Sequence, residues 1–312
     1  SKIIKVLVFG SNGLVGSSLT RVLSKNKLYN VIPSTRKEVD LFDFTSTKKY
    51  LNEIDPDIVI NAAAKVGGIH ANNTQRMDFV LENLKINMNI LEACVEKNNI
   101  AIINLGSSCI YPLNAENPIQ ETSIMNGKLE PTNSPYAMAK LTAIEIGNAL
   151  SIQYGHKIIN LMPTNLYGPN DNFHPTNSHV IPGLISKFHN GKINKQETVQ
   201  IWGDGSPLRE FLYVDDLSSA ISFIIENDIN NSLMNVGSSE EVSILGLAEM
   251  IKDVVGFKGI IAFDETKPNG NDRKLLDSSL INSFGWRPKI GLNEGLDKTY
   301  SWYVNNYDNL RV

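Results

Sequence analysis

The chain has 312 residues, enough for one large α/β domain with an appended lobe or for two cooperating domains. With 42% hydrophobic and 20% charged residues the composition is that of a folded globular protein, and a formal net charge of −4 leaves no positive field to attract nucleic acid or an acidic membrane. The two cysteines, Cys94 and Cys109, lack metal-ligand spacing, which argues against a metal site or a disulfide framework and favours a reducing cytoplasm.

From the N-terminus, short apolar runs alternate with amphipathic stretches, the pattern of βαβ units around a parallel sheet. No signal-peptide pattern precedes the first run, and no run approaches the ~20 apolar residues that span a membrane. We predict buried strands at residues 5–9, 31–34, 58–61, 102–105 and 158–162.

Two long helices are predicted between these strands. At residues 83–96 apolar side chains, Met88 among them, recur on one helical face. Residues 135–154 form the second helix, with Ser134 as its N-cap and Pro135 tolerated in the first turn.

Beyond Pro163 the chain becomes rich in Asn, Pro, Gly and His, as loops that contact ligands beside a sheet often are. Further helices are predicted at 180–188, 215–226 and 243–255. These elements predict an α/β protein with a doubly wound parallel sheet of Rossmann type and a smaller C-terminal substrate-binding lobe. We expect residues 1–165 to bind a dinucleotide and 166–312 mainly the substrate, with a segment near 195–240 as a candidate to return to the first domain.

The first predicted strand leads into a glycine-rich turn that opens a helix. Glycines allow a tight turn and close approach to a pyrophosphate, which the helix N-terminus also favours. An isolated glycine triplet could equally be a turn without a ligand, but a strand before it and a helix after it favour a cofactor. The residues expected to contact that cofactor are Gly10, Ser11, Asn12, Gly13, Leu14, Val15 and Gly16.

The end of the second strand indicates which dinucleotide is bound. An acidic residue there would bind a ribose 2′-hydroxyl, whereas this chain offers Ser34, Thr35 and Arg36. Arg36 can hold a 2′-phosphate with charge-assisted hydrogen bonds, so NADPH is expected in preference to NADH. A solvated arginine is the competing interpretation. Asp40 and Leu41 follow at a place suited to the adenine ring.

Tyr136 and Lys140 lie one turn apart on the predicted helix, after a strand that ends in serines. A phenol, with an ordinary pKa of about 10, is a weak acid–base group at neutral pH, and an adjacent ammonium is expected to lower that pKa. Ser107 or Ser108 would then orient a carbonyl. A tyrosine and a lysine at this spacing occur in many helices, so the order of glycine turn, serines and helix carries the prediction of a carbonyl reductase.

Several segments resemble the GDP-L-fucose synthases, which are extended short-chain dehydrogenases/reductases. They are the glycine turn, GSSCIYP, PYAMAK, PTNLYGPNDNFHPTNSHVIP, IWGDGSPLREFLYVDDL and KPNGNDRKLLD. The resemblance covers nearly the whole chain and implies a two-stage reaction on GDP-4-keto-6-deoxy-D-mannose: epimerisation at C3 and C5, then hydride transfer from NADPH to C4. It implies Cys109 as the base and His179 as the acid of the epimerisation, roles that composition and spacing alone do not reveal.

The resemblance also implies the remaining contacts. Those to NADP(H) would come from Leu105, Gly106, Ser107, Ser108, Tyr136, Lys140, Pro163, Thr164, Asn165, Leu166 and His179. Those to the substrate would come from Ser108, Asn165, Lys187, Trp202, Arg209, Asn269 and Lys274. Three residues depart from the family pattern: Lys187 where arginine is frequent, Asn269 where aspartate is frequent, and Asn12 where some relatives have a basic residue.

Two alternatives remain open at this level. One is a 4-reductase or epimerase of another nucleotide-linked 4-keto sugar, such as a GDP-colitose or GDP-heptose precursor. The other is a non-catalytic NADP(H) sensor, which would have no use for a proton donor beside the nicotinamide. By analogy with the family a homodimer is expected, with no nucleic acid and no membrane as partner.

Overall fold

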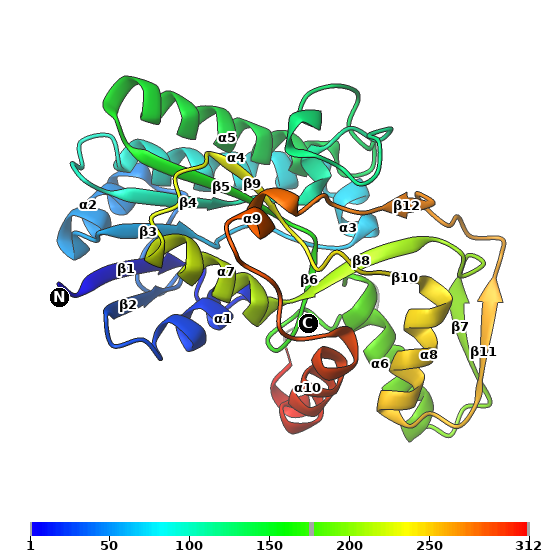
Figure 1. Cartoon of the computed structure of the whole chain (residues 1–312). Helices are drawn as coiled ribbons and strands as arrows, with labels where there is room; N and C mark the ends of the chain where they lie inside the picture. The colour runs from blue at the N-terminus through cyan, green and yellow to red at the C-terminus, as the bar shows by residue number, and fades with distance from the viewer. Residues whose placement is uncertain (1, 175–177, 311–312) are drawn as a thin grey trace.

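A computed structural model describes residues 2–174 and 178–310 (Figure 1). Its centre is a six-stranded sheet in the order β2-β1-β3-β4-β5-β9, in which every neighbouring pair is parallel. The strands are β1 (Ile4–Phe9), β2 (Tyr29–Ser34), β3 (Ile58–Asn61), β4 (Ala101–Leu105), β5 (Lys157–Pro163) and β9 (Leu233–Val236). The predicted Rossmann-type fold is confirmed.

Helices cover both faces of this sheet (Figure 1). Side chains alternate along β1, so that Val6 and Val8 enter one core and Leu7 and Phe9 the other. The first core is closed by α1 (Leu14–Leu23) and α7 (Val214–Glu226), and the second by α2 (Phe44–Ile54), α4 (Arg76–Ala93) and α5 (Ser134–Tyr154). Burial on both faces explains why the central strands β1, β3, β4 and β5 are mostly apolar, whereas the edge strand β2 is partly exposed and carries polar residues.

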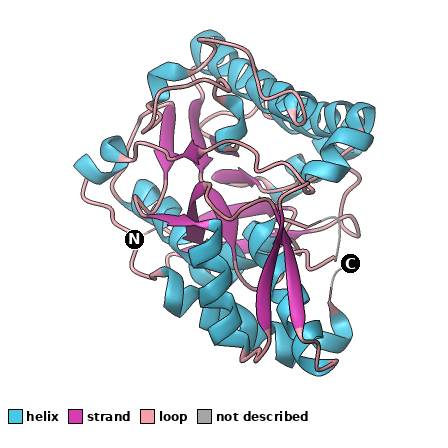
Figure 2. Ribbon diagram, turned by 90° about the vertical axis from the view of Figure 1, so that its right-hand side faces the viewer, coloured by secondary structure: helices cyan, strands magenta, loops and turns pink. Residues whose placement is uncertain are grey.

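A second lobe has its own hydrophobic core and smaller sheets (Figure 2). In one sheet β8 lies between β10 and β12 and also pairs with β6, and in the other β7 pairs with β11. Its strands are β6 (Asn165–Tyr167), β7 (Thr198–Trp202), β8 (Leu208–Tyr213), β10 (Glu241–Ser243), β11 (Ile260–Asp264) and β12 (Arg273–Lys274). Its helices are α6 (Val180–Ile193), α8 (Ile244–Val255) and α10 (Leu292–Asn305).

The chain passes between the lobes more than once. In the segment 195–240, β7 stays in the second lobe, whereas α7 and β9 lie in the first. A short helix, α9 (Ser279–Ser283), later returns to the first lobe and adds Ile281 to its core. The short elements α3 (Ile69–Thr74), η1 (Ser108–Ile110), η2 (Glu121–Ser123) and η3 (Tyr307–Asn309) complete the described part of the chain.

Two details of the helix prediction were wrong. Helix α4 begins at Arg76 rather than at residue 83, and Met88, which was assigned to its apolar face, is exposed. The N-cap of α5 is Asn133, while Ser134 is already helical. Within residues 2–174 and 178–310, no helix combines the length and apolar character that a bilayer crossing requires.

Candidate active site

The glycine turn places backbone where a dinucleotide could approach it. Gly10 has φ +73°, and a side chain there would collide with the backbone of Ala62 at 2.7 Å. A Cβ atom on Gly16 would lie 2.0 Å from the carbonyl oxygen of Gly10, so the first turn of α1 packs directly on the end of β1. Gly13 is the N-cap of α1 and supplies no side-chain acceptor to its first N–H groups. These groups remain suited to bind a phosphate.

The end of β2 lies beside this turn, since the N–H of Ser11 donates to the carbonyl oxygen of Ser34 (3.0 Å). The Ser34 hydroxyl is buried without a hydrogen-bond partner, and Arg36, two residues further, is exposed. A polar group buried in this way calls for a partner. The turn, the hydroxyl and the guanidinium therefore fit a phosphorylated dinucleotide. Asp40 is also exposed, but its carboxylate already accepts the N–H of Phe42 (3.0 Å).

Lys140 and Tyr136 project from α5 toward the end of β4. The Lys140 ammonium donates to the carbonyl oxygen of Leu105 (3.1 Å) and lies 5.5 Å from the centre of the Tyr136 ring. Burial lowers the pKa of Lys140 to about 8. Phe79 packs edge-on against the same ring, with centroids 6.3 Å apart. The tyrosine is thus fixed by an aromatic contact on α4 and a cation on its own helix.

The expectation that the ammonium lowers the pKa of Tyr136 was wrong. Burial raises the pKa of the phenol well above its ordinary value, and the negative charge that Cys109 would carry raises it further. The ammonium lies over the ring, 5.5 Å from its centroid, and does not offset the desolvation of the phenolate. Tyr136 is therefore fully protonated at neutral pH, the state required of a proton donor.

Ser107 and Cys109 lie at the end of β4, where the chain enters η1. The Ser107 hydroxyl oxygen accepts the N–H of Cys109 (3.3 Å) and so caps η1. The Cys109 side chain is only 6% exposed, and burial raises the pKa of its thiol. The positive charges of Lys274 and Lys140 and a hydrogen bond with Ser107 act in the opposite direction. The structure thus brings Ser107, Cys109, Tyr136, Lys140 and Lys274 together.

His179 belongs to the other lobe, as the N-cap of α6. Its imidazole is reached by solvent, yet the surrounding protein desolvates it and lowers its pKa. The thiol and the imidazole are therefore supplied by different lobes. Of the motif that precedes His179, residues 175–177 lie outside the described residues.

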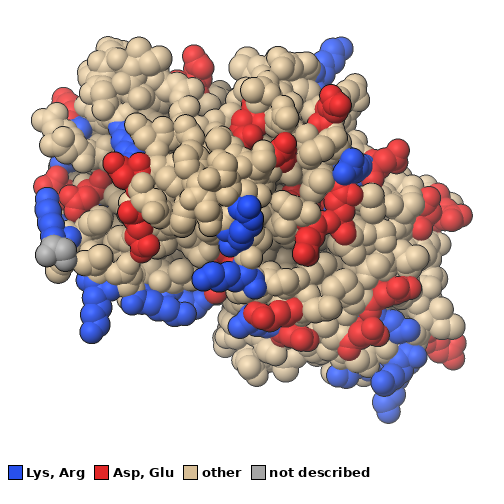
Figure 3. Space-filling view, in the orientation of Figure 1, with Lys and Arg blue, Asp and Glu red and all other residues tan. Residues whose placement is uncertain are grey.

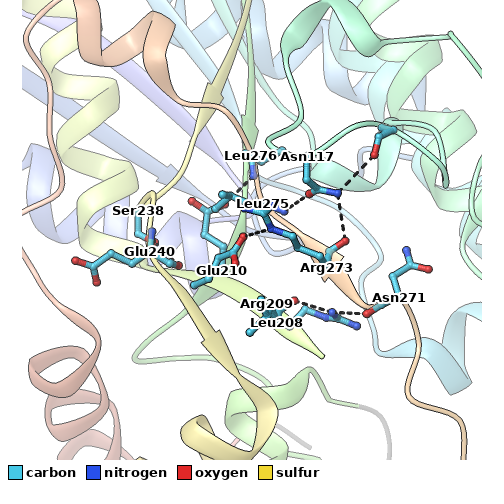
Figure 4. A network of polar contacts seen from close by, with 12 residues as sticks. Asn117, Leu208, Arg209, Glu210, Ser238, Glu240, Asn271, Arg273, Leu275 and Leu276 are labelled. Carbon is cyan, nitrogen blue, oxygen red and sulfur yellow. Dashed lines mark hydrogen bonds and ion pairs between the residues drawn. The ribbon is translucent and has the colours of Figure 1, made fainter. Parts of the chain in front are cut away.

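Figure 4 shows the polar network that joins β8 to β12. Arg209 donates to the carbonyl oxygens of Leu208 (2.8 Å) and Asn271 (2.6 Å), and its Cα pairs with that of Lys274. Lys274 has its pKa lowered mainly by burial, with the charge of Arg209 adding to this and that of Cys109 opposing it. The two cations are thus held side by side.

Glu210 is a central residue of this network that sequence reasoning missed. Its carboxylate is fully buried and accepts the backbone N–H groups of Ser239 (2.8 Å) and Leu276 (3.1 Å). Its carbonyl oxygen accepts hydrogen bonds from Asn165 (2.9 Å) and from the buried Thr164 (3.3 Å). A carboxylate followed directly by the apolar residues Phe211 and Leu212 was the available signal. Glu210 links the exposed Asn165 to the strand that carries Lys274.

Trp202 stands at the end of β7 with 63% of its surface exposed. The ammonium groups of Lys187 and Lys267 lie over its ring, 5.9 and 5.3 Å from the centroid. Lys267 was not among the predicted site residues, although it opens the same segment as Lys274. Asn269 supports the adjoining loop, since its side-chain oxygen accepts the N–H of Asp204 (2.8 Å). An exposed indole beside two cations suits a ligand with flat and anionic parts.

These local cations matter because the surface has no broad positive field. Figure 3 shows acidic and basic side chains interspersed over most of one face. Among the described residues, no group of three or more His, Cys, Asp or Glu side chains could hold a metal ion.

Comparison with known proteins agrees with this arrangement. A model of the NAD dependent epimerase/dehydratase family matches residues 6–237. The chain is 48% identical to GDP-L-fucose synthase 1 of Arabidopsis thaliana over 305 residues, which cover 98% of this chain and 94% of the relative. It is 42% identical to GDP-L-fucose synthase of Escherichia coli (strain K12), with 98% of each chain covered. A crystal structure of a GDP-L-fucose synthetase from Naegleria fowleri bound to NADP matches with a TM-score of 0.91 at 27% identity, covering 100% of this chain and 97% of that one.

Proposed function

Because the chain belongs to the NAD dependent epimerase/dehydratase family, and within it to the GDP-L-fucose synthases, we propose that it converts GDP-4-keto-6-deoxy-D-mannose to GDP-L-fucose with NADPH. The supporting observation in the structure is the convergence of Ser107, Cys109, Tyr136 and Lys140 at the carboxyl end of the sheet, where the glycine turn also lies. Ligands of open parallel sheets bind at this edge.

The first lobe would hold the dinucleotide. The backbone of Gly10, Gly13 and Gly16 would approach the pyrophosphate, and Ser34 and Arg36 would receive the 2′-phosphate. Bound NADPH supplies the hydride for C4. Tyr136, kept protonated by its raised pKa, donates a proton to the sugar oxygen, while Ser107 orients the carbonyl. The nearby Lys140 ammonium stabilises the phenolate that remains.

The epimerisation uses Cys109 and His179. The 4-keto group acidifies the hydrogens at C3 and C5, so Cys109 removes a proton there and His179 returns one on the opposite face. Burial raises the pKa of the Cys109 thiol, and the charges of Lys274 and Lys140 act against this and so favour the thiolate that this step requires. The lowered pKa of His179 makes its protonated form a stronger acid than an ordinary imidazolium.

The second lobe would hold the GDP moiety. Arg209, Lys274 and Lys187 supply positive charge for the diphosphate, and the exposed Trp202 ring covers a flat part of the nucleotide. We propose that the boundary between the dinucleotide-binding and substrate-binding domains lies at residue 165.

The decisive experiment is incubation with GDP-4-keto-6-deoxy-D-mannose in D₂O, with and without NADPH, followed by NMR of the product. We expect deuterium at C3 and C5 without NADPH, and GDP-L-fucose with it. Hydride transfer to C4 without deuterium uptake would instead indicate a 4-reductase that lacks the epimerase activity. Binding of NADPH with no turnover of any GDP- or dTDP-linked 4-keto sugar would indicate a sensor.

We also propose a homodimer formed through α4 and α5. Large apolar side chains stand exposed on these two helices: Met77, Leu81, Met88 and Met138. Apolar groups gathered on neighbouring helices are typical of an interface. Light scattering coupled to size exclusion should give twice the mass of one chain.

The two cysteines are free and buried, which fits action in the reducing cytoplasm.

A further inference from the structure

The loop after β3 approaches the residue that precedes His179. This loop ends at Gly68, the N-cap of α3, and a Cβ atom on Gly68 would lie only 2.6 Å from the carbonyl oxygen of Ser178. The backbone of Gly68, with φ −73° and ψ −175°, is one that any residue adopts. Contact with Ser178, and not conformation, is therefore what requires glycine at this position.

Ser178 is also enclosed from the side of α6. A Cβ atom on Gly183, in the first turn of that helix, would lie 3.1 Å from the Ser178 hydroxyl oxygen. His179 is the N-cap between them, and its side chain makes no capping hydrogen bond. The position of the imidazole thus depends on the backbone of Ser178 before it and of the first turn of α6 after it.

The loop that carries Gly68 is itself rigidly held. The buried Asn83 accepts the N–H of Lys65 (2.9 Å) and donates to the Lys65 carbonyl oxygen (3.1 Å). The buried Asn72 donates to the carbonyl oxygens of Gly67 (2.9 Å) and Gly68 (3.0 Å). Because α4 and α3 fix the loop in this way, an atom added at Gly68 would displace Ser178 rather than the loop.

We propose that Gly68 is a positioning residue for His179, acting through its contact with Ser178. The inference rests on the proposed function, in which His179 returns a proton to the sugar. Gly68 lies in the first lobe and His179 in the second, so the contact fixes the acid of one lobe against the lobe that supplies Cys109. Misplacement of a reacting group by about 1 Å can cost on the order of 100-fold in rate.

The test compares Gly68→Ala with Gly291→Ala. Gly291 is also a helix N-cap, with φ −72° and ψ 169°, but a Cβ atom there would meet nothing within 4 Å. We expect Gly68→Ala to slow deuterium uptake at C3 and C5 roughly 10- to 100-fold while the Kd for NADPH stays unchanged. Gly291→Ala should match wild type in both. Exchange at the wild-type rate in Gly68→Ala would overturn the inference, whereas a wild type that exchanges no deuterium would overturn the proposed function instead.

A double-mutant cycle separates positioning from general destabilisation. If Gly68 acts through His179, Gly68→Ala should cause no further loss of exchange in a His179→Gln background. Losses that multiply in the double variant would refute the inference. If Gly68→Ala does not fold, Asn72→Ala provides the readout, because it removes the hydrogen bonds to the carbonyl oxygens of Gly67 and Gly68 and so loosens the loop that abuts Ser178. It should lose exchange roughly tenfold with unchanged NADPH binding, and wild-type exchange would again refute the inference.

Discussion

Burial acts oppositely on Tyr136 and Lys140. It raises the pKa of the phenol and lowers that of the ammonium, because in each case the charged form is desolvated. At neutral pH the phenol is protonated and the lysine is still charged, which is the combination that reduction of a carbonyl needs. Removal of the phenol oxygen alone should therefore abolish reduction without disturbing the fold.

Tyr136→Phe is expected to lower kcat for reduction by roughly 10²- to 10⁴-fold, because no other positioned group donates the proton. The Kd for NADPH, measured by fluorescence titration, should stay within about twofold of wild type. Tyr154→Phe makes the same change on the same helix at an exposed position and serves as the control. Turnover at the wild-type rate in Tyr136→Phe would contradict the assignment of the proton donor.

Lys140 sets a pH limit on the same step. Its pKa of about 8 means that the ammonium is present below that pH and is lost as the pH rises through it. Because kcat/KM reports the ionisation of the free enzyme, the reduction should fall about tenfold per pH unit above pH 8. A profile measured from pH 6 to 10 checks this. A flat profile to pH 10, close to the ordinary lysine value of about 10.4, would show that the charge of Lys140 is not required.

The strands of this fold could be predicted well from the sequence, and one helix poorly. The five predicted strands all exist, each within two residues of the predicted bounds, because continuous apolar runs mark strands buried on both faces. The prediction of helix α4 was wrong because its buried surface includes Asn83 and Asn87. Asn83 bonds to Lys65, and Asn87 accepts from Asn61 (3.0 Å), so polar residues occupy positions where periodicity expects apolar ones.

Glu210 on β8 likewise uses buried hydrogen bonds, which join it to the segments that follow β9 and β12. Each carboxylate oxygen accepts one backbone N–H, from Leu276 and Ser239 respectively. Glu210→Gln keeps the shape but replaces one acceptor by a donor, which leaves a buried N–H unpaired at a cost of about 1–3 kcal/mol. We expect a lower melting temperature and a raised KM for the nucleotide sugar, because β12 carries Lys274, with an unchanged Kd for NADPH. The exposed Glu240→Gln is the control, and equal stability of the two variants would contradict this role.

The site combines residues that no local sequence pattern connects. The glycine turn and the Tyr136–Lys140 pair could be recognised because each is a short motif on one element. The proximity of Lys274 to Cys109 could not, since it depends on β12 pairing with β8 at the junction of the lobes. The roles of Cys109 and His179 came from resemblance alone, and Lys267 reaches Trp202 only because β7 and β11 pair.

Because the two nucleotides are proposed to bind in different lobes, one substitution should weaken GDP binding and another should weaken NADP⁺ binding. A ligand at a hundred times its Kd stabilises the native state by about 2.7 kcal/mol, which differential scanning fluorimetry detects as a rise in melting temperature. Trp202→Ala should lose most of the rise caused by GDP and keep that caused by NADP⁺, because the exposed indole lies at the end of β7 in the second lobe. Arg36→Ala should show the reverse and should affect NADP⁺ more than NAD⁺, since only the former carries a 2′-phosphate. Each variant is the control for the other. If either one lost both responses, GDP and NADP⁺ would not occupy separate lobes, and the proposed placement of the nucleotide sugar beside Trp202 would be wrong.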